Sequence, residues 1–179
     1  MPSVTQVLKF VQDKAFARVP ASVLEIACDR GQEVHRLCVG YAKCLWVGES
    51  FPKFLGYYNS FTRWFDEYVE EVILAEERLY DPVLNYDGEP DLILVIKGDS
   101  LPSLWDLKTP VQPAKSWRPQ VAAYRHLAIT DRHLEIGRVG CVRLSPEGRP
   151  PILDESTDTV FLDFNIFRSA LNIYHYFKD

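Results

Sequence analysis

Two carboxylates and a lysine lie where short apolar strands are expected, and side chains of these types could act together in catalysis. Asp91 precedes the run Leu-Ile-Leu-Val-Ile, whereas Asp106 and Lys108 lie within Leu-Trp-Asp-Leu-Lys. Gln120 and Tyr124 follow at a spacing of four, so they would share one face of a helix. Mg²⁺ is usually held by one or two carboxylates together with water and phosphate oxygens. We therefore expect a site for a divalent metal and a phosphodiester.

Strand geometry explains how these groups would meet. Side chains alternate between the two faces of a strand, so Asp106 and Lys108 should share one face. Residues 97–102 (Lys-Gly-Asp-Ser-Leu-Pro) are rich in turn formers and predict a hairpin that places Asp91 opposite this pair. The plain structural alternative is a surface Asp–Lys pair, which would contribute at most about 1 kcal/mol. The combination of hairpin and helix favours the site.

Several short motifs, in the right order, resemble those of a known enzyme family. Pro90-Asp91 together with Asp106-Leu107-Lys108 resembles the signature of the PD-(D/E)XK nucleases. Gln120-x-x-x-Tyr124 resembles an additional motif of their RecB-like and lambda-exonuclease-like branches. Gly31-x-x-x-His35 resembles the motif on an early helix of these branches, and Glu76-Glu77-Arg78-Leu79 resembles their acidic strand motif. The resemblance covers about residues 25–128.

The resemblance implies a role for each matching residue. The ligands of a catalytic Mg²⁺ or Mn²⁺ would be His35, Glu77, Asp91, Asp106 and the backbone carbonyl of Leu107. The motif does not decide between Glu77 and its neighbour Glu76, and we prefer Glu77.

The remaining matches would act on water or DNA. Lys108 would be the catalytic lysine, which can orient or help deprotonate the attacking water and offset negative charge in the transition state. Gln120 and Tyr124 would orient water or the DNA backbone. The expected catalytic residues are thus Asp91, Asp106, Lys108, Gln120 and Tyr124.

His35 has a structural alternative of its own. It lies beside an apolar stripe at helical spacing that includes Val34, Leu37, Cys38 and Tyr41. A histidine on the rim of such a stripe is more often half-exposed than a ligand. Gly31 and the other motifs reverse this preference, and we expect a site role.

The charge distribution suggests which side would meet DNA. The net charge is −5, which argues against a nucleic-acid partner, but residues 108–149 contain eight Lys or Arg and three Asp or Glu. Such a basic segment is typical of a phosphate-binding track. The expected DNA contacts are Lys115, Arg118 and Arg125, and solvated charges are the alternative for each of them. The aromatic residues between 51 and 72 are better explained as core than as a base-stacking surface.

Composition indicates one soluble domain. The chain has 179 residues, 47% of them hydrophobic, which is enough to form a sizeable core. It contains no run of 18 apolar residues and no signal-like N-terminus, so we expect a cytoplasmic protein without a membrane partner. Its four cysteines form no Cys-x-x-Cys pair, and three of them come early in the chain. We therefore expect no iron–sulfur cluster.

The expected fold is α/β, in one domain over residues 1–179. Helices are expected at 4–17, 21–47 (with a possible break near residues 29–31) and 51–72, and strands at 73–80, 82–86, 90–97 and 103–108. A helix at 115–129, a strand at 135–144 and a helix at 163–177 would follow. The resemblance implies a restriction-endonuclease-like αβββαβ core, with a mixed central sheet flanked by helices and extra N-terminal helices. The helical part would span about 1–72 and the catalytic core about 73–145.

These expectations lead to one functional hypothesis and its alternatives. The leading hypothesis is a Mg²⁺- or Mn²⁺-dependent deoxyribonuclease, an exonuclease of recombination or repair, and small relatives of this kind are often phage proteins. Analogy with lambda-type exonucleases suggests a homo-oligomer and a strand-annealing or recombination partner protein. A structure- or sequence-specific endonuclease is the first alternative. A non-catalytic nucleic-acid-binding module is the second, although such a module would be expected to lose Asp91, Asp106 or Lys108.

Overall fold

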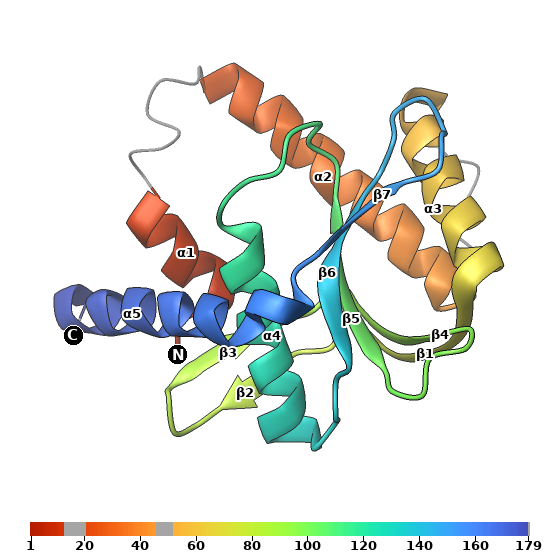
Figure 1. Cartoon of the computed structure of the whole chain (residues 1–179). Coiled ribbons are helices and arrows are strands. Elements are labelled where there is room, and N and C mark those ends of the chain that lie inside the picture. The colour runs from red at the N-terminus through yellow and green to blue at the C-terminus, as the bar shows by residue number, and fades with distance from the viewer. Residues whose placement is uncertain (13–20, 46–51, 179) are drawn as a thin grey trace.

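A five-stranded mixed sheet with helices on both faces forms the centre of the molecule (Figure 1). The computed structural model describes residues 1–12, 21–45 and 52–178. The helices are α1 (Val4–Gln12), α2 (Ala21–Ala42), α3 (Leu55–Tyr68), α4 (Trp117–Arg132) and α5 (Val160–Lys178). The strands are β1 (Val69–Ala75), β2 (Leu79–Asp81), β3 (Tyr86–Gly88), β4 (Leu92–Ile96), β5 (Ser103–Lys108), β6 (Arg138–Arg143) and β7 (Ile152–Glu155). Short 3₁₀ turns precede α3 (Pro52–Phe54) and α5 (Thr157–Thr159).

The order of strands in the sheet is β1-β4-β5-β6-β7. The pairs β1–β4, β4–β5 and β6–β7 are antiparallel, whereas β5 and β6 are parallel. A parallel pair needs a crossover, and α4 supplies it on one face of the sheet (Figure 1). Strands β2 and β3 form a separate two-stranded hairpin between β1 and β4. The predicted α/β class, with a mixed sheet flanked by helices, is therefore confirmed.

The two faces of the sheet are covered by different helices. On one face, α2 and α3 pack on side chains such as Trp105 and Leu107. On the other face, α1, α4 and α5 pack on side chains such as Ile93 and Leu104. This alternation along β5 is the pattern expected of a strand buried on both faces. Asp106 and Lys108 share one face of the strand, as the alternation predicted, and this is the face that α4 covers.

The hairpin that brings the acidic residues together is also present. Between β4 and β5 the chain turns at residues 97–102, where the Asp99 amide donates to the Ile96 carbonyl at 2.9 Å. Gly98 has φ = +89°, a conformation that strongly favours glycine. In the ladder, Leu92 pairs with Trp105. Asp91 therefore lies beside the C-terminal half of β5.

The predicted helix at 51–72 is wrong at its end. Helix α3 stops at Tyr68, and Val69–Ala75 is strand β1, so the sheet begins before residue 73. The aromatic spacing ends at Tyr68, and β-branched Val69, Val72 and Ile73 follow, which favour a strand. Pairing with the distant strand β4 then decides the conformation, with register shifts between Val69 and Glu71 and between Val72 and Leu74. Residue 51 lies outside the described residues.

Other boundaries also differ from the prediction. The strands expected at 73–80 and 82–86 are replaced by the end of β1 and by the short hairpin β2–β3 with its turn at 82–85. Strand β7 was not predicted, and α5 begins at Val160 rather than at residue 163. Helix α2 continues through residues 29–31 without the expected break. The expected helical residues 13–17, 46 and 47 lie outside the described residues.

In the described part of the chain, no helix combines the length and the apolar character needed to cross a membrane.

Candidate active site

Asp91 and Asp106 are the two buried carboxylates of the candidate site, just before β4 and near the end of β5. Asp91, just before β4, is 6% exposed, and its Oδ2 accepts a hydrogen bond from the Leu107 amide at 2.6 Å. Asp106 is 1% exposed and forms an ion pair with Lys108 two residues later. Buried carboxylates are rare unless they are paired or bind a metal. The predicted cluster of two carboxylates and a lysine is therefore assembled in the structure.

His35 joins this cluster from α2. Its helix packs Val34 and Cys38 into the core, which carries the imidazole to the rim beside the sheet. The ring Nδ1 lies 3.2 Å from Asp91 Oδ1, and Nε2 lies 2.9 Å from the Leu107 carbonyl oxygen. The sequence therefore predicted correctly that His35, Asp91 and the Leu107 carbonyl come together.

The same neighbours set the protonation of His35. Burial alone would lower the pKa of the imidazole. The charge of Asp91 and the bond to it, with smaller contributions from Asp106 and the Leu107 carbonyl, instead raise the pKa of His35 to about 9. At neutral pH the ring is therefore an imidazolium that can donate to both Asp91 and Leu107.

A chain of hydrogen bonds links Lys108 to helix α4. The Lys108 ammonium donates to Gln120 Oε1 at 2.9 Å, and Gln120 Nε2 donates to the Tyr124 hydroxyl at 3.2 Å. The ammonium also lies 5.7 Å from the centroid of the Trp117 ring. The predicted helix face of Gln120 and Tyr124 thus points at the predicted lysine.

Burial and charge act in different directions on the members of this chain. Burial and the charge of Asp91 raise the pKa of Asp106, although Lys108 opposes them. Burial would lower the pKa of Lys108, but Asp106 and other neighbours more than offset this and raise it. Burial, with the charge of Asp106, raises the pKa of Tyr124. Lys108 is therefore a cation and Tyr124 a neutral hydroxyl in this arrangement.

The structure brings Glu76 to the cluster instead of Glu77. Glu77 is exposed, and its carboxylate lies 3.4 Å from the Arg132 guanidinium, away from the predicted ligands. Glu76 has φ = +46°, and its amide donates to the Asp91 carbonyl at 3.1 Å. Burial and then the charge of Asp91 raise the pKa of the Glu76 carboxyl. The preference for Glu77 is thus corrected, because the chain leaves the sheet at Glu76 and turns the next side chain outward.

A cavity of about 740 Å³ opens beside the cluster. Its lining comes from α1, α2, the end of β1 and the end of β5, and includes His35, Glu76, Leu107 and Lys108. Helix α2 contributes Gly31 and other residues one turn apart, which explains why the Gly31-x-x-x-His35 spacing faces the site. The cluster is thus accessible to a ligand from outside.

The predicted DNA contacts divide into two kinds. Lys115 and Arg118 are exposed at the start of α4 and form no ion pair within the described residues. They line a neighbouring cavity of about 480 Å³. Arg125 instead donates to the Ile136 carbonyl from two nitrogens, each at 3.3 Å, and lies over the Phe161 ring. Arg125, in the middle of α4, therefore holds the segment that follows this helix and is not placed as a DNA contact.

The donor atoms of the cluster fit a hard divalent cation. Across the described ranges, no three His, Cys, Asp or Glu side chains form a ready-made metal site. Mg²⁺ needs fewer protein ligands, since water and substrate oxygens complete its shell. Asp91, Asp106 and the Leu107 carbonyl supply oxygen donors, and the buried Asp106 Oδ2 has the Lys108 ion pair but no well-formed hydrogen bond among these residues. An added cation would satisfy this oxygen.

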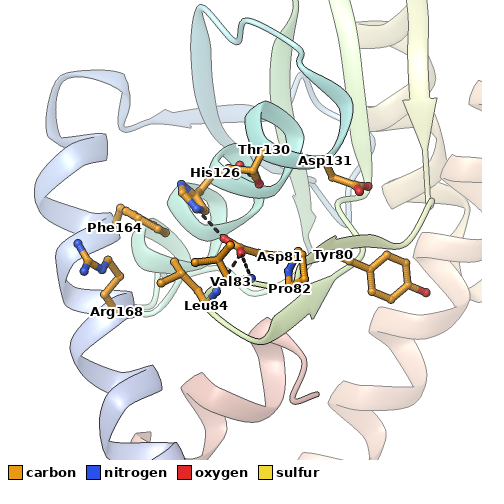
Figure 2. Close-up of a pocket in the computed structure, with 10 residues that line it drawn as sticks. All are labelled: Tyr80, Asp81, Pro82, Val83, Leu84, His126, Thr130, Asp131, Phe164 and Arg168. Carbon is orange, nitrogen blue, oxygen red and sulfur yellow. Dashed lines mark hydrogen bonds and ion pairs between the residues drawn. The ribbon is translucent and has the colours of Figure 1, made fainter.

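A separate cavity of about 600 Å³ lies between the β2–β3 turn, α4 and α5 (Figure 2). At its centre, His126 Nε2 lies 2.9 Å from Asp81 Oδ2, and Asp81 Oδ1 accepts from the Val83 and Leu84 amides at 2.8 and 2.9 Å. The His126 ring stacks on Phe164 at 4.2 Å. These contacts fasten the hairpin to α4, and the lining includes none of the predicted site residues.

Comparison with known proteins adds no family assignment. No protein-family model matches this chain, and no curated protein matches it either. The function must therefore be inferred from the cluster of Asp91, Asp106, Lys108 and His35 and from its surroundings.

Proposed function

We propose that this protein is a Mg²⁺- or Mn²⁺-dependent deoxyribonuclease of the PD-(D/E)XK type. The observation that carries the proposal is the junction of Asp91, Asp106 and Lys108 at the ends of two paired strands. Lys108 is hydrogen-bonded to Gln120, and Gln120 is hydrogen-bonded to Tyr124, both on the crossover helix α4. A structural Asp–Lys pair would need neither a second buried carboxylate nor this hydrogen-bonded helix face.

The order of elements supports the same proposal. Helix α3 is followed by β1, β4 and β5, then by the crossover α4 and the parallel strand β6. With β2–β3 as an insertion, this is the αβββαβ order that the family resemblance implies. The motif residues lie where that order would need them, at the ends of β4 and β5 and at the start of α4.

Some side chains of the cluster would bind the metal, and others would bind the substrate. Asp91, Asp106 and the Leu107 carbonyl would hold the cation, with His35 as a further ligand after it loses its proton. The cation, when bound, would lower the pKa of a water molecule and offset charge on the phosphoryl group. Lys108, as an ammonium, would donate to a phosphate oxygen and stabilise the charge that develops there. Gln120 would hold Lys108 in place.

DNA would approach through the cavity beside α2 and β5. The exposed Lys115 and Arg118 lie at the start of α4 and line the neighbouring cavity together with Trp117, over whose ring the Lys108 ammonium lies. A cationic edge beside a cavity attracts the phosphate backbone and makes binding weaker as salt rises. Exonuclease action is the form we propose, because the spacing of Gln120 and Tyr124 resembles a motif of the RecB-like and lambda-exonuclease-like branches.

One comparison of substrates tests this proposal. With Mg²⁺ or Mn²⁺, the wild-type protein should degrade linear duplex DNA and leave closed circles intact. Lys108→Met should lower the cleavage rate about 100- to 1000-fold, since it removes the ammonium but keeps an unbranched side chain. Lys9→Met, which removes an exposed lysine of α1 outside the proposed site, serves as the matched control and should leave the rate unchanged. Cutting of closed circles would indicate an endonuclease, and no cleavage of any DNA would contradict the enzymatic proposal.

Gly88 is a residue that the sequence did not single out, although it positions Tyr124. A Cβ at this position would lie 2.7 Å from Tyr124 Cε1 and 2.9 Å from Leu127 Cδ1. Such contacts are too short, so Gly88→Ala should push the Tyr124 ring from its place and break its bond to Gln120. We expect about a tenfold lower cleavage rate, measured on linear duplex DNA.

A double-mutant cycle separates this effect from general damage. Tyr124→Phe removes only the hydroxyl, so Gly88→Ala should cost much less in that background than in the wild type. Equal losses in both backgrounds would show that Gly88 does not act through the Tyr124 hydroxyl.

A further inference from the structure

Helix α5 has a second apolar face that the described residues leave uncovered. Its inner face packs Phe167, Ala170 and Leu171 into the core. On another side lie four large apolar side chains with exposed fractions between 45% and 82%. These are Leu162, Ile166, Ile173 and Tyr176, which together with Ser169 we name the α5 seam. A soluble helix usually has a single apolar stripe, so a second stripe indicates a binding surface.

The spacing of the α5 seam indicates another helix as the occupant. Its five positions follow one another at intervals of four, three, four and three residues. This is the a/d spacing of a coiled-coil interface, which keeps one narrow face towards a partner helix. The inner face of α5 serves the core, so the two faces have separate functions. Figure 1 shows α5 at one side of the molecule, with α1 and α4 as its neighbouring helices.

The area of this surface agrees with what a stable dimer buries. Phe161 and Phe177 are also exposed, 74% and 68%, and lie on opposite flanks of the seam, about 100° around the helix from its first and last residues. Arg125 lies over the Phe161 ring, and Phe10 lies near the Phe177 ring. With roughly 200 Å² for a fully exposed large side chain, the four apolar seam residues alone expose about 480 Å², and the two flanking phenylalanines bring the total to about 750 Å². A standard interface buries about 800 Å² on each partner. The seam together with its flanks therefore offers about the area that a second copy of this chain would cover in a standard interface.

Charge and shape favour a second copy over DNA or a lipid surface. No seam residue is charged, so self-pairing buries no charge and creates no like-charge repulsion at the contact. A membrane-surface helix would carry many basic residues on its polar face. Over its 19 residues, helix α5 has three basic residues, Arg168, His175 and Lys178. DNA would likewise need cations at the seam.

The seam is also nearly symmetric about its small central residue. Leu162 and Tyr176 each lie seven residues from Ser169, and Ile166 and Ile173 lie three and four residues from it. In an antiparallel pair, Leu162 would face the partner's Tyr176, and Ile166 would face the partner's Ile173. The small Ser169 at the twofold axis lets the two helices approach closely. In an antiparallel pair, the positive N-terminal end of each helix lies near the negative C-terminal end of the other, which also favours this orientation.

We propose that the protein forms an antiparallel homodimer through the α5 seam, with Ser169 at the twofold axis. The pairing is isologous, so it closes at two copies and leaves no free seam. The dimer would place two copies of the candidate active site in one particle. It does not depend on the proposed nuclease activity, since none of the site residues contributes to the seam.

Sedimentation velocity of the full chain over a series of concentrations tests the dimer. The wild type should sediment as a dimer that dissociates on dilution. Ile166→Glu would place a carboxylate in the centre of the interface and should raise the dissociation constant about 100-fold. Arg168→Glu changes an exposed residue of the same helix outside the seam and should leave the constant unchanged within about threefold. A chain that stays monomeric at all concentrations would overturn the proposal and leave the seam to a different protein.

Disulfide crosslinking tests the register independently of the affinity. In a background with Cys28→Ser and Cys44→Ser, Ser169→Cys should link two chains under oxidising conditions, since only a short Cα–Cα separation permits the bond. Leu162→Cys should not link to itself but should link to a chain carrying Tyr176→Cys. Self-linking of Leu162→Cys would overturn the antiparallel arrangement.

Discussion

Asp106→Asn should abolish metal-dependent DNA cleavage, with a rate at least about 1000-fold below that of the wild type. The substitution keeps the size of the side chain but removes the charge that would hold the cation and that pairs with Lys108. Asp106 is only 1% exposed, so no water molecule can take the place of the lost carboxylate oxygen as a ligand or as the partner of Lys108. The rate should be measured on linear duplex DNA at saturating Mg²⁺.

A neighbouring carboxylate provides the control for this experiment. Asp154 on β7 pairs with Arg143 at 2.9 Å, and its strand position is directly opposite Cys141, which pairs in turn with Asp106. Asp154→Asn removes an equal charge from the same sheet and should leave cleavage almost unchanged. Calorimetric titration with Mn²⁺ should show lost binding for Asp106→Asn alone. Unchanged Mn²⁺ binding in that variant would show that Asp106 is not a ligand.

Asp91→Ala should eliminate activity and also lower the stability of the metal-free protein. The Leu107 amide would lose its acceptor, and the His35 imidazolium would lose its closest anion. Removal of one partner from a buried pair is costly, although the relief of repulsion between Asp91 and Asp106 offsets part of the loss. We expect a decrease of about 2–4 kcal/mol in the free energy of unfolding, measured by urea denaturation with a chelator present.

The pH dependence of stability reports on the same ion pair. The folded protein raises the pKa of His35 from 6.5 to about 9, so the folded state binds this proton more tightly than the unfolded state does. The stabilisation is therefore fully present below pH 6.5 and is lost as the pH rises through 9. Asp91→Ala should flatten the decline between these two values. An equally steep decline in Asp91→Ala would assign it to other groups.

The residues of the candidate site were more predictable from the sequence than the boundaries of the helices and strands. Side-chain alternation placed Asp106 and Lys108 on one face, and the turn residues at 97–102 placed Asp91 beside them. Both inferences depend on local geometry, which a few residues determine. The spacing of Gln120 and Tyr124 on one helix face is of the same kind.

The errors arose where distant contacts decide the outcome. The first residues of Val69–Ala75 were expected to extend the helix, but this segment pairs with β4, whose partner residues lie 17 to 27 positions further along the chain. Glu76 and Glu77 are chemically alike, and only the left-handed backbone at Glu76 decides which of them faces the cluster. Arg125 was predicted to contact DNA because it lies in a basic segment, and the sequence alone does not show that the fold places the Ile136 carbonyl next to its guanidinium.

The irregular pairing of β1 has a consequence for the solubility of the protein. This strand is one edge of the sheet, and an exposed edge is a template on which other chains can add strands and aggregate. Its two register shifts interrupt the row of free amides and carbonyls, and Glu70 and Glu71 add exposed charge there. The edge is thus a poor template for further strands, which protects the protein from indefinite edge-to-edge growth while its uncovered apolar helix face stays available for a partner.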